Sequence, residues 1–153
     1  MRGSSSWTSV SGTRTFYPSH VSPDAAELGL AGTWRLLEYV DRDRESDPWT
    51  PTFGTSPAGI LLYHPTGLLS IQIAAARDDF TASYRYLGYF GTYELGEARS
   101  NGDAIVGVVE HHMKAAFPPE LFADDPERIF TLSGDRLMLG DGLTWRRTFE
   151  RVV

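Results

Sequence analysis

The sequence contains no cysteine at all. Disulfide bonds, thiolate nucleophiles and zinc sites built on sulfur are therefore excluded. It also contains no apolar run approaching the roughly 18 residues of a membrane-spanning helix, so we expect no membrane partner. The 20 acidic residues outnumber the 14 basic ones and no basic cluster is present. This balance argues against nucleic acid as a partner.

The first residues of the chain lack the apolar block of a secretion signal, so we expect a cytoplasmic protein. A length of 153 residues fits one domain with its own core. Residues 1–21 are rich in Ser and Thr and lack periodicity, which predicts an N-terminal tail, and residues 22–153 form the predicted domain. Aromatic residues in the tail could contact a neighbouring subunit, so a homodimer is one candidate assembly.

Aromatic residues, glycine and proline are plentiful, and their spacing favours many short strands joined by turns. A short helix is predicted over 22–28, with Ser22 as N-cap, Pro23 in its first turn and Gly29 as its stop. Alternating patterns predict eight strands, at 33–40, 59–63, 68–74, 84–95, 104–116, 128–132, 137–139 and 143–150. The first and last both carry Trp and Arg, which suggests that they pair. We therefore predict an all-β fold, an eight-stranded antiparallel up-and-down barrel whose lumen is the working site.

Glu38 is the first catalytic candidate. It alternates with Trp34 and Leu36, so it faces the lumen if Trp34 does. Burial disfavours the charged form of a carboxylate and brings its pKa toward values useful for proton transfer. Two alternatives stay open: the strand bulges so that Glu38 faces water, or Glu38 pairs with Arg147.

His111 is the second catalytic candidate, because it lies on the apolar face of its strand with Val109 and Met113. It could act as a general base or as a hydrogen-bond donor, or it could be a core histidine whose hydrogen bonds are satisfied within the protein. His111 and His112 point to opposite faces of a strand, so they do not form a metal pair. We predict no metal site.

Several further residues are predicted to contact a ligand. Trp34 and Met113 belong to inner faces of their strands. Four tyrosines lie in the aromatic-rich fourth strand: Tyr84, Tyr86, Tyr89 and Tyr93. Trp49 and Phe53 lie in the long loop 41–58, where they either cover the barrel mouth or pack on its wall. Arg147 either binds an anionic ligand group or packs on Trp34.

The chain resembles the lipocalin-like domain family, small members of the calycin group. The matching segments are Gly32-Thr33-Trp34-Arg35-Leu36, Gly59-Ile60-Leu61-Leu62-Tyr63, Pro65-Thr66-Gly67, Leu69-Ser70-Ile71-Gln72-Ile73, Tyr89-Phe90-Gly91-Thr92-Tyr93-Glu94, Val109-Glu110-His111-His112, Gly134-Asp135-Arg136-Leu137 and Leu143-Thr144-Trp145-Arg146-Arg147. The resemblance spans about residues 29–150 and implies an eight-stranded barrel with a ligand cavity. In lipocalins an Arg of the last strand packs over the Trp of the first strand, and Arg147 is the position that fits. Relatives of this shape include carriers of hydrophobic molecules and cyclases or isomerases.

The sequence therefore predicts a protein that binds a small hydrophobic or semi-polar molecule in the barrel. The leading hypothesis is a cofactor-free isomerase or cyclase of secondary metabolism, in which Glu38 or His111 moves a proton and a tyrosine stabilises charge on oxygen. No phosphate loop or dinucleotide fingerprint is present, and no cofactor is expected. The alternatives are a non-catalytic carrier with the same cavity and an interaction module whose interior is filled.

Overall fold

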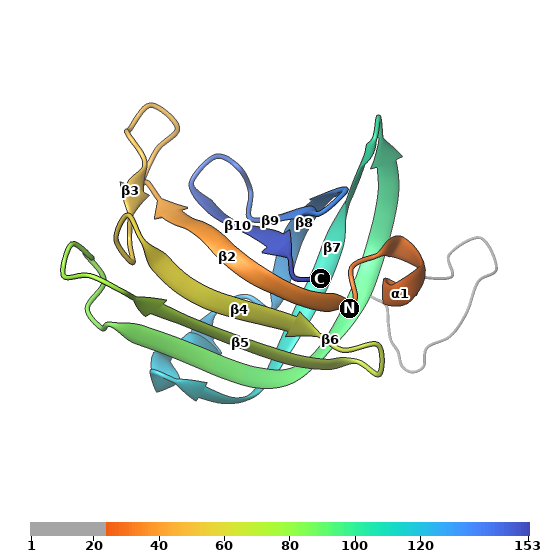
Figure 1. Cartoon of the computed structure of the whole chain (residues 1–153), viewed down its shortest axis with the longest axis horizontal. Helices are drawn as coiled ribbons and strands as arrows, with labels where there is room; N and C mark the ends of the chain where they lie inside the picture. The colour runs from red at the N-terminus through yellow and green to blue at the C-terminus, as the bar shows by residue number, and fades with distance from the viewer. Residues whose placement is uncertain (1–23) are drawn as a thin grey trace.

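The fold is a closed antiparallel barrel, described here for residues 24–153 of a computed structural model (Figure 1). The predicted tail over 1–21, together with Ser22 and Pro23, lies outside the described residues. Consecutive strands pair with each other, and the last strand pairs with the first, which closes the wall. The eight barrel strands are β2 (Gly32–Asp41), β4 (Pro57–Tyr63), β5 (Leu68–Ala75), β6 (Tyr86–Asn101), β7 (Ala104–Phe117), β8 (Glu127–Ser133), β9 (Arg136–Leu139) and β10 (Trp145–Arg151). The predicted barrel is confirmed.

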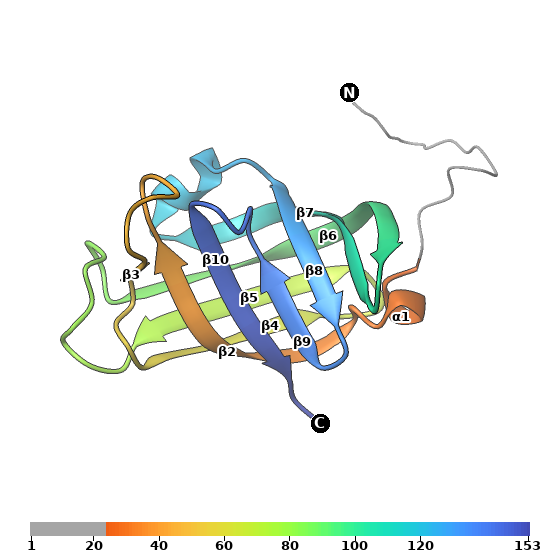
Figure 2. The same ribbon diagram turned by 90° about the horizontal axis from the view of Figure 1, so that it is seen from above.

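Three short elements lie at the two ends of the barrel (Figure 2). Helix α1 (Ala25–Leu28) is at one end, and its N-cap is Asp24, whose side chain accepts a hydrogen bond from Ala26 N. Gly29 ends the helix with a φ of 85°, a conformation that favours glycine. The two-residue strand β3 (Thr50–Pro51), which pairs with β2, and the 3₁₀ helix η2 (Pro119–Ala123) are at the opposite end. We call the α1 end closed and the other end open.

The closed end is filled by side chains. Trp34 is fully buried and donates from its indole nitrogen to the carbonyl of Leu30, 3.0 Å away. The guanidinium of Arg151 lies 4.3 Å from the Trp34 ring centre. The prediction that Arg147 makes this contact is wrong, because the register of β10 on β2 places Arg151 opposite Trp34 and Arg147 opposite Tyr39. No helix in the described part of the chain is long and apolar enough to cross a membrane.

A β-bulge in the middle of β2 changes which side chains face the lumen. Phe149 pairs with Leu36 and Thr148 pairs with Glu38, so Leu37 is an extra residue without a partner on β10. Trp34 and Leu36 are buried before the bulge, and Tyr39 faces the cavity after it. Glu38 is consequently turned to the outer face, where its side chain is 43% exposed. The prediction that Glu38 faces the lumen is therefore wrong.

Candidate functional site: a cavity at the open end

The lumen contains a cavity of about 450 Å³ at the open end of the barrel. This volume lies within the range of roughly 300–1,000 Å³ that ligand pockets usually have. Apolar side chains from three strands, β5, β6 and β9, line part of it: Ile71, Ile73, Leu87 and Leu139. Three aromatic residues, two arginines and four carboxylates also line it: Tyr39, Tyr89, Trp145, Arg128, Arg147, Asp124, Asp125, Glu127 and Asp141. The cavity can therefore hold a mostly apolar molecule that carries a few polar atoms.

Behind the cavity wall, His111 forms hydrogen bonds with two tyrosines. Its Nδ1 lies 2.8 Å from the hydroxyl of Tyr89, and its Nε2 lies 2.6 Å from the hydroxyl of Tyr63. His111 is 2% exposed, and burial lowers its pKa from 6.5 to about 3. The imidazole is therefore neutral at physiological pH, with one nitrogen donating and the other accepting.

The surroundings of Tyr63 favour one direction for these hydrogen bonds. Tyr63 is completely buried, and His111 is the partner found for its hydroxyl among the described residues. If Nε2 carried the proton, the Tyr63 hydroxyl proton would be left without an acceptor, which is costly in a buried site. We therefore assign the donor roles as Tyr63 to Nε2 and Nδ1 to Tyr89. With its oxygen accepting from His111, the Tyr89 hydroxyl can donate into the cavity.

Tyr89 brings this polar chain to the cavity surface. Burial raises its pKa, and the guanidinium of Arg128 opposes that rise by favouring the phenolate. Val109 pairs with Arg128 across β7 and β8, which places Arg128 on the inner face near His111. Tyr89 is thus a protonated hydroxyl whose oxygen is close to a hydrogen-bond donor and to a positive charge. Such a group can donate a hydrogen bond to a ligand oxygen, or a proton when negative charge develops there.

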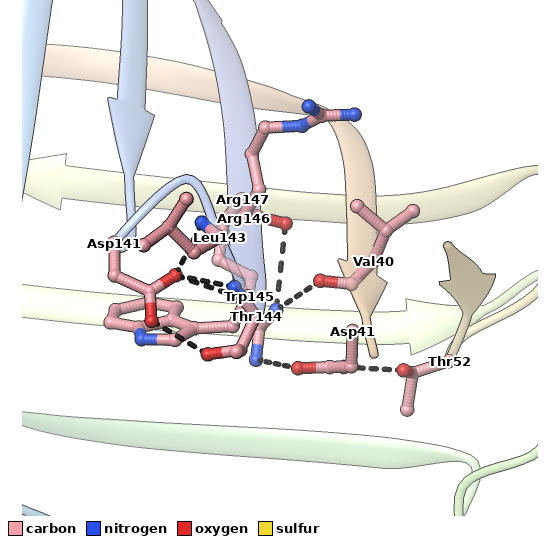
Figure 3. Close-up of polar contacts among 9 residues, drawn as sticks. All are labelled: Val40, Asp41, Thr52, Asp141, Leu143, Thr144, Trp145, Arg146 and Arg147. Atoms are coloured by element: carbon pink, nitrogen blue, oxygen red, sulfur yellow. Dashed lines mark hydrogen bonds and ion pairs between the residues drawn. The ribbon is translucent and has the colours of Figure 1, made fainter. Parts of the chain in front are cut away.

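Arg147 lies at the rim of the cavity, where contacts with Val40 and Asp41 fix its side chain (Figure 3). Its guanidinium is 3.5 Å from the ring centre of Tyr39, and one nitrogen is 3.0 Å from Asp41 Oδ1. A second nitrogen donates to the carbonyl of Val40 over 2.9 Å. Asp41 also accepts a hydrogen bond from the hydroxyl of Thr52. Arg147 therefore faces the cavity with its charge already balanced by a carboxylate.

The turn before β10 is shaped by Asp141, whose Oδ1 accepts from three successive backbone amides (Figure 3). Its other oxygen accepts from the hydroxyl of Thr144 over 2.6 Å. Partial desolvation opposes ionisation, but these hydrogen bonds outweigh it and lower the pKa of Asp141 to about 2. The turn places Trp145 where it lines both the cavity and an outer hollow of about 650 Å³. Asp141 thus has a structural role at the cavity mouth.

Of the residues predicted from the sequence, Tyr89 and Arg147 line the cavity and His111 stands directly behind Tyr89. Trp34 belongs to the closed end. Tyr93 is 6% exposed, and its hydroxyl donates to the carbonyl of His64, also away from the cavity. Met113 pairs with Gly91 on the neighbouring strand and does not line the cavity.

The remaining predicted residues pack against the wall. Tyr86 is 40% exposed and its ring stacks on Phe117 on the outside of the barrel. The guanidinium groups of Arg42 and Arg146 lie 3.9 Å and 4.6 Å from the ring centre of Trp49. Neither ring lines the cavity, so these two predicted ligand contacts are not found.

Phe53 and Tyr84 form part of the core near the cavity and are absent from its lining. Phe53 is 1% exposed and its ring packs on Tyr39 at 4.8 Å and on Tyr84 at 6.1 Å. The loop 41–58 therefore packs on the barrel through both of its aromatic residues, and the interpretation of that loop as an aromatic lid finds no support in these contacts. Tyr84 and Phe53 support the position of Tyr39.

Sequence reasoning missed Tyr63 and Arg128. Tyr63 alternates with Leu61 on β4, and Arg128 alternates with Phe130 and Leu132 on β8. In both strands the alternation places a polar group on an apolar face, which is the signal that had drawn attention to His111. The same search applied to every strand would have found both residues.

One group of side chains in the described residues has the spacing of metal ligands: Glu94, Glu110 and His112. These residues lie at partly exposed positions on the outer face, and His112 Nε2 is 3.0 Å from Glu110 Oε1. The group lies outside the cavity lining, and the chemistry of the cavity does not involve it.

Comparison with known proteins agrees with the barrel fold. Curated proteins gave no significant match. The family model described as a lipocalin-like domain matches residues 31–148, which is most of the chain and includes all eight barrel strands except part of β10. A barrel of this kind suggests the binding of a small hydrophobic ligand. The chain therefore belongs to the family of lipocalin-like domains.

Proposed function

We propose that this protein binds a small hydrophobic or semi-polar molecule in its cavity and catalyses a cofactor-free isomerisation or cyclisation of that molecule. The observation that carries the proposal is the Tyr89 hydroxyl, which faces an apolar cavity while His111 and Tyr63 hold it from behind. A site that only excluded water from an apolar ligand would not need three buried polar side chains connected by hydrogen bonds. Such a chain is costly to bury unless each member is satisfied.

In the proposed mechanism, Tyr89 contacts a ligand oxygen and donates a proton as negative charge develops there. The Tyr89 oxygen then becomes more negative, and the nearby Arg128 and the Nδ1–H of His111 stabilise it. The apolar wall holds the substrate in a folded conformation, which removes part of the entropic barrier. His111 is therefore a positioning residue, and Glu38 on the outer face has no part in the reaction.

The low pKa of His111 limits the class of reaction. With a pKa of about 3, His111 cannot hold an additional proton near neutral pH. The hydrogen-bonded residues Tyr63, His111 and Tyr89 can therefore give a proton to the substrate only if Tyr89 is reprotonated in the same catalytic cycle. The proton that Tyr89 gives to the substrate oxygen must be replaced from the same molecule: as the new O–H bond forms, a C–H bond next to the carbonyl breaks, and its proton passes to the Tyr89 oxygen. Isomerisation and cyclisation are reactions of this proton-neutral kind.

Binding is tested with 1-anilinonaphthalene-8-sulfonate, whose fluorescence rises in apolar sites. We expect the wild type to bind this dye saturably and neutral ketones to displace it. In Tyr89→Phe the affinity for the ketones should be about fivefold to tenfold lower, because one hydrogen bond is lost. Tyr86→Phe, which alters an exposed tyrosine outside the cavity, serves as the matched control. Equal affinities in all three proteins would contradict the assignment of Tyr89.

Catalysis is tested by following the exchange of α-hydrogens of enolisable cyclic ketones with deuterated water by NMR. The wild type should accelerate exchange of the ketones that bind. In Tyr89→Phe the accelerated exchange should be at least about tenfold slower than in the wild type, because the proton donor is gone. Binding of these ketones without any acceleration would contradict the catalytic part of the proposal and would identify the protein as a carrier.

A further inference from the structure

Arg128 differs from the other arginine of the cavity in its partners. One of its terminal nitrogens donates to the backbone carbonyls of Asp125 and Glu127. Within residues 24–153, no carboxylate lies within salt-bridge distance of its guanidinium. Arg147, by contrast, pairs with Asp41. Arg128 therefore brings a positive charge to the cavity wall that the described part of the chain does not pair.

Four carboxylates line the cavity, and none of them lies within salt-bridge distance of Arg128 in the described part of the chain: Asp124, Asp125, Glu127 and Asp141. Asp124 is exposed. Asp141 is engaged with the amides of its own turn. Asp125 Oδ1 accepts from the backbone amide of Glu127. Glu127 precedes Arg128 on β8 and pairs with Glu110, so it belongs to the opposite face of the strand, and it is exposed. A charged group near an apolar cavity is stabilised when an opposite charge accompanies it.

Building on the proposed function, we propose that Arg128 and Tyr89 together bind a delocalised oxyanion of the ligand, a carboxylate or the enolate of a 1,3-dicarbonyl compound. The ligand is therefore a small, mostly apolar acid. Its anionic end meets the guanidinium and the hydroxyl, and its apolar body lies against Ile71, Ile73 and Leu87.

The chemistry of the two side chains suits a planar, two-oxygen anion. A guanidinium presents several N–H donors in one plane, and a carboxylate or a dicarbonyl enolate presents oxygens that can accept from two of them. Tyr89 adds a third donor, since its own oxygen accepts from His111. A neutral ketone or amide would use the Tyr89 hydroxyl equally well but would leave the charge of Arg128 unpaired. The site should therefore distinguish an acid from a neutral molecule of the same shape.

Two pairs of probes test this at neutral pH by isothermal titration calorimetry. The first pair is 2-naphthoate and 2-naphthamide, and the second is the enolate of 5,5-dimethylcyclohexane-1,3-dione and its neutral methyl enol ether. We expect the wild type to bind at least one anion about tenfold or more tighter than its neutral partner. The pair that shows the larger preference identifies whether the anion is a carboxylate or an enolate.

Three variants locate the preference. In Arg128→Met the two members of each pair should bind with affinities within about twofold of each other. Arg128→Lys keeps the charge but not the planar donors, so it should retain only part of the preference. Arg136→Met removes a positive charge from an exposed position on β9 outside the cavity, and it should keep the full preference. Circular dichroism verifies that each variant is folded, and Arg128→Lys decides the result if Arg128→Met does not fold.

The outcomes separate this proposal from the proposed function. Equal binding of acid and neutral probes by the wild type, or an unchanged preference in folded Arg128→Met or Arg128→Lys, overturns the role of Arg128. The proposed function survives that result if Tyr89→Phe still weakens the neutral probes. If none of the four compounds binds while the cyclic ketones do, this proposal fails alone; if the ketones do not bind either, both proposals fail.

Discussion

Two arginines of the inner wall, one at each end of the barrel, differ in how the chain satisfies them. At the closed end, Arg151 lies over Trp34, and its nitrogens bind the carbonyls of Gly29 and Ala31 and approach Asp135. At the open end, Arg128 contacts two backbone carbonyls through one nitrogen and otherwise faces the cavity. An inward arginine is thus structural where the chain itself satisfies its donors. Where donors remain available at a cavity surface, the same residue type can recognise a ligand.

The largest effect that tests this comparison is expected at the closed end. Trp34→Ala should lower the free energy of unfolding by about 3–5 kcal/mol, because a fully buried indole is replaced by a cavity and its contact with Arg151 is lost. Chemical denaturation followed by circular dichroism measures the loss. Trp49→Ala, which removes a tryptophan from the outer surface, is the matched control and should cost clearly less. Similar losses for the two variants would show that the closed end does not dominate stability.

An intermediate effect is expected from His111, which lies between the two ends. Its pKa is about 3 in the folded protein, against about 6.5 in the unfolded chain. Above pH 6.5 both states are neutral at this position, and its contribution to stability is complete. As the pH falls from 6.5 toward 3, the unfolded chain gains a proton that the folded protein does not. The free energy of unfolding should therefore fall by up to about 1.4 kcal/mol per pH unit from this residue.

Denaturation of the wild type and of His111→Gln over this pH range isolates the contribution of His111. The difference in slope between the two proteins should approach the value given above. His112→Gln alters the neighbouring histidine on the outer face and serves as the control for the loss of an imidazole. Parallel curves for the wild type and His111→Gln would contradict the neutral, buried imidazole.

The smallest effect is expected for Glu38→Gln. Glu38 is partly exposed on the outer face and pairs with Arg146 at 3.0 Å. Exposed ion pairs contribute little, so the free energy of unfolding should change by less than about 1 kcal/mol. Affinity for 1-anilinonaphthalene-8-sulfonate and the rate of ketone exchange should stay at wild-type values. A marked loss of exchange would return Glu38 to the mechanism.

The fold was predictable from the sequence because it depends on local patterns. Alternation within each strand, together with glycine-containing turns, was enough to find eight strands and their order. The inner position of His111 also follows from alternation alone, because β7 is regular from Ile105 to that residue. The closure of the barrel was inferred from two strands of similar composition, and the pairing of β10 with β2 confirms it.

The facing of Glu38 and the partner of Trp34 could not be predicted in the same way. Both depend on how β2 and β10 are aligned, and that alignment joins residues more than a hundred positions apart. The bulge at Leu37 has no signature in the neighbouring sequence, since no glycine or proline marks it. The contact was assigned to Arg147, but Arg151 lies on the same face of β10, and only the register decides which of the two meets Trp34.

The extra residue at Leu37 has a consequence for how this wall could change over time. Deleting Leu37 would make Leu36 and Glu38 direct neighbours that keep their partners Phe149 and Thr148 on β10, so the pairing would become continuous with Glu38 still outward and Tyr39 still inward. Loss of the bulge without a deletion would have the opposite effect, because strict alternation from Trp34 through Leu37 would turn Glu38 inward and Tyr39 outward. The bulge therefore keeps an aromatic ring, and not a carboxylate, at the cavity rim beside Arg147.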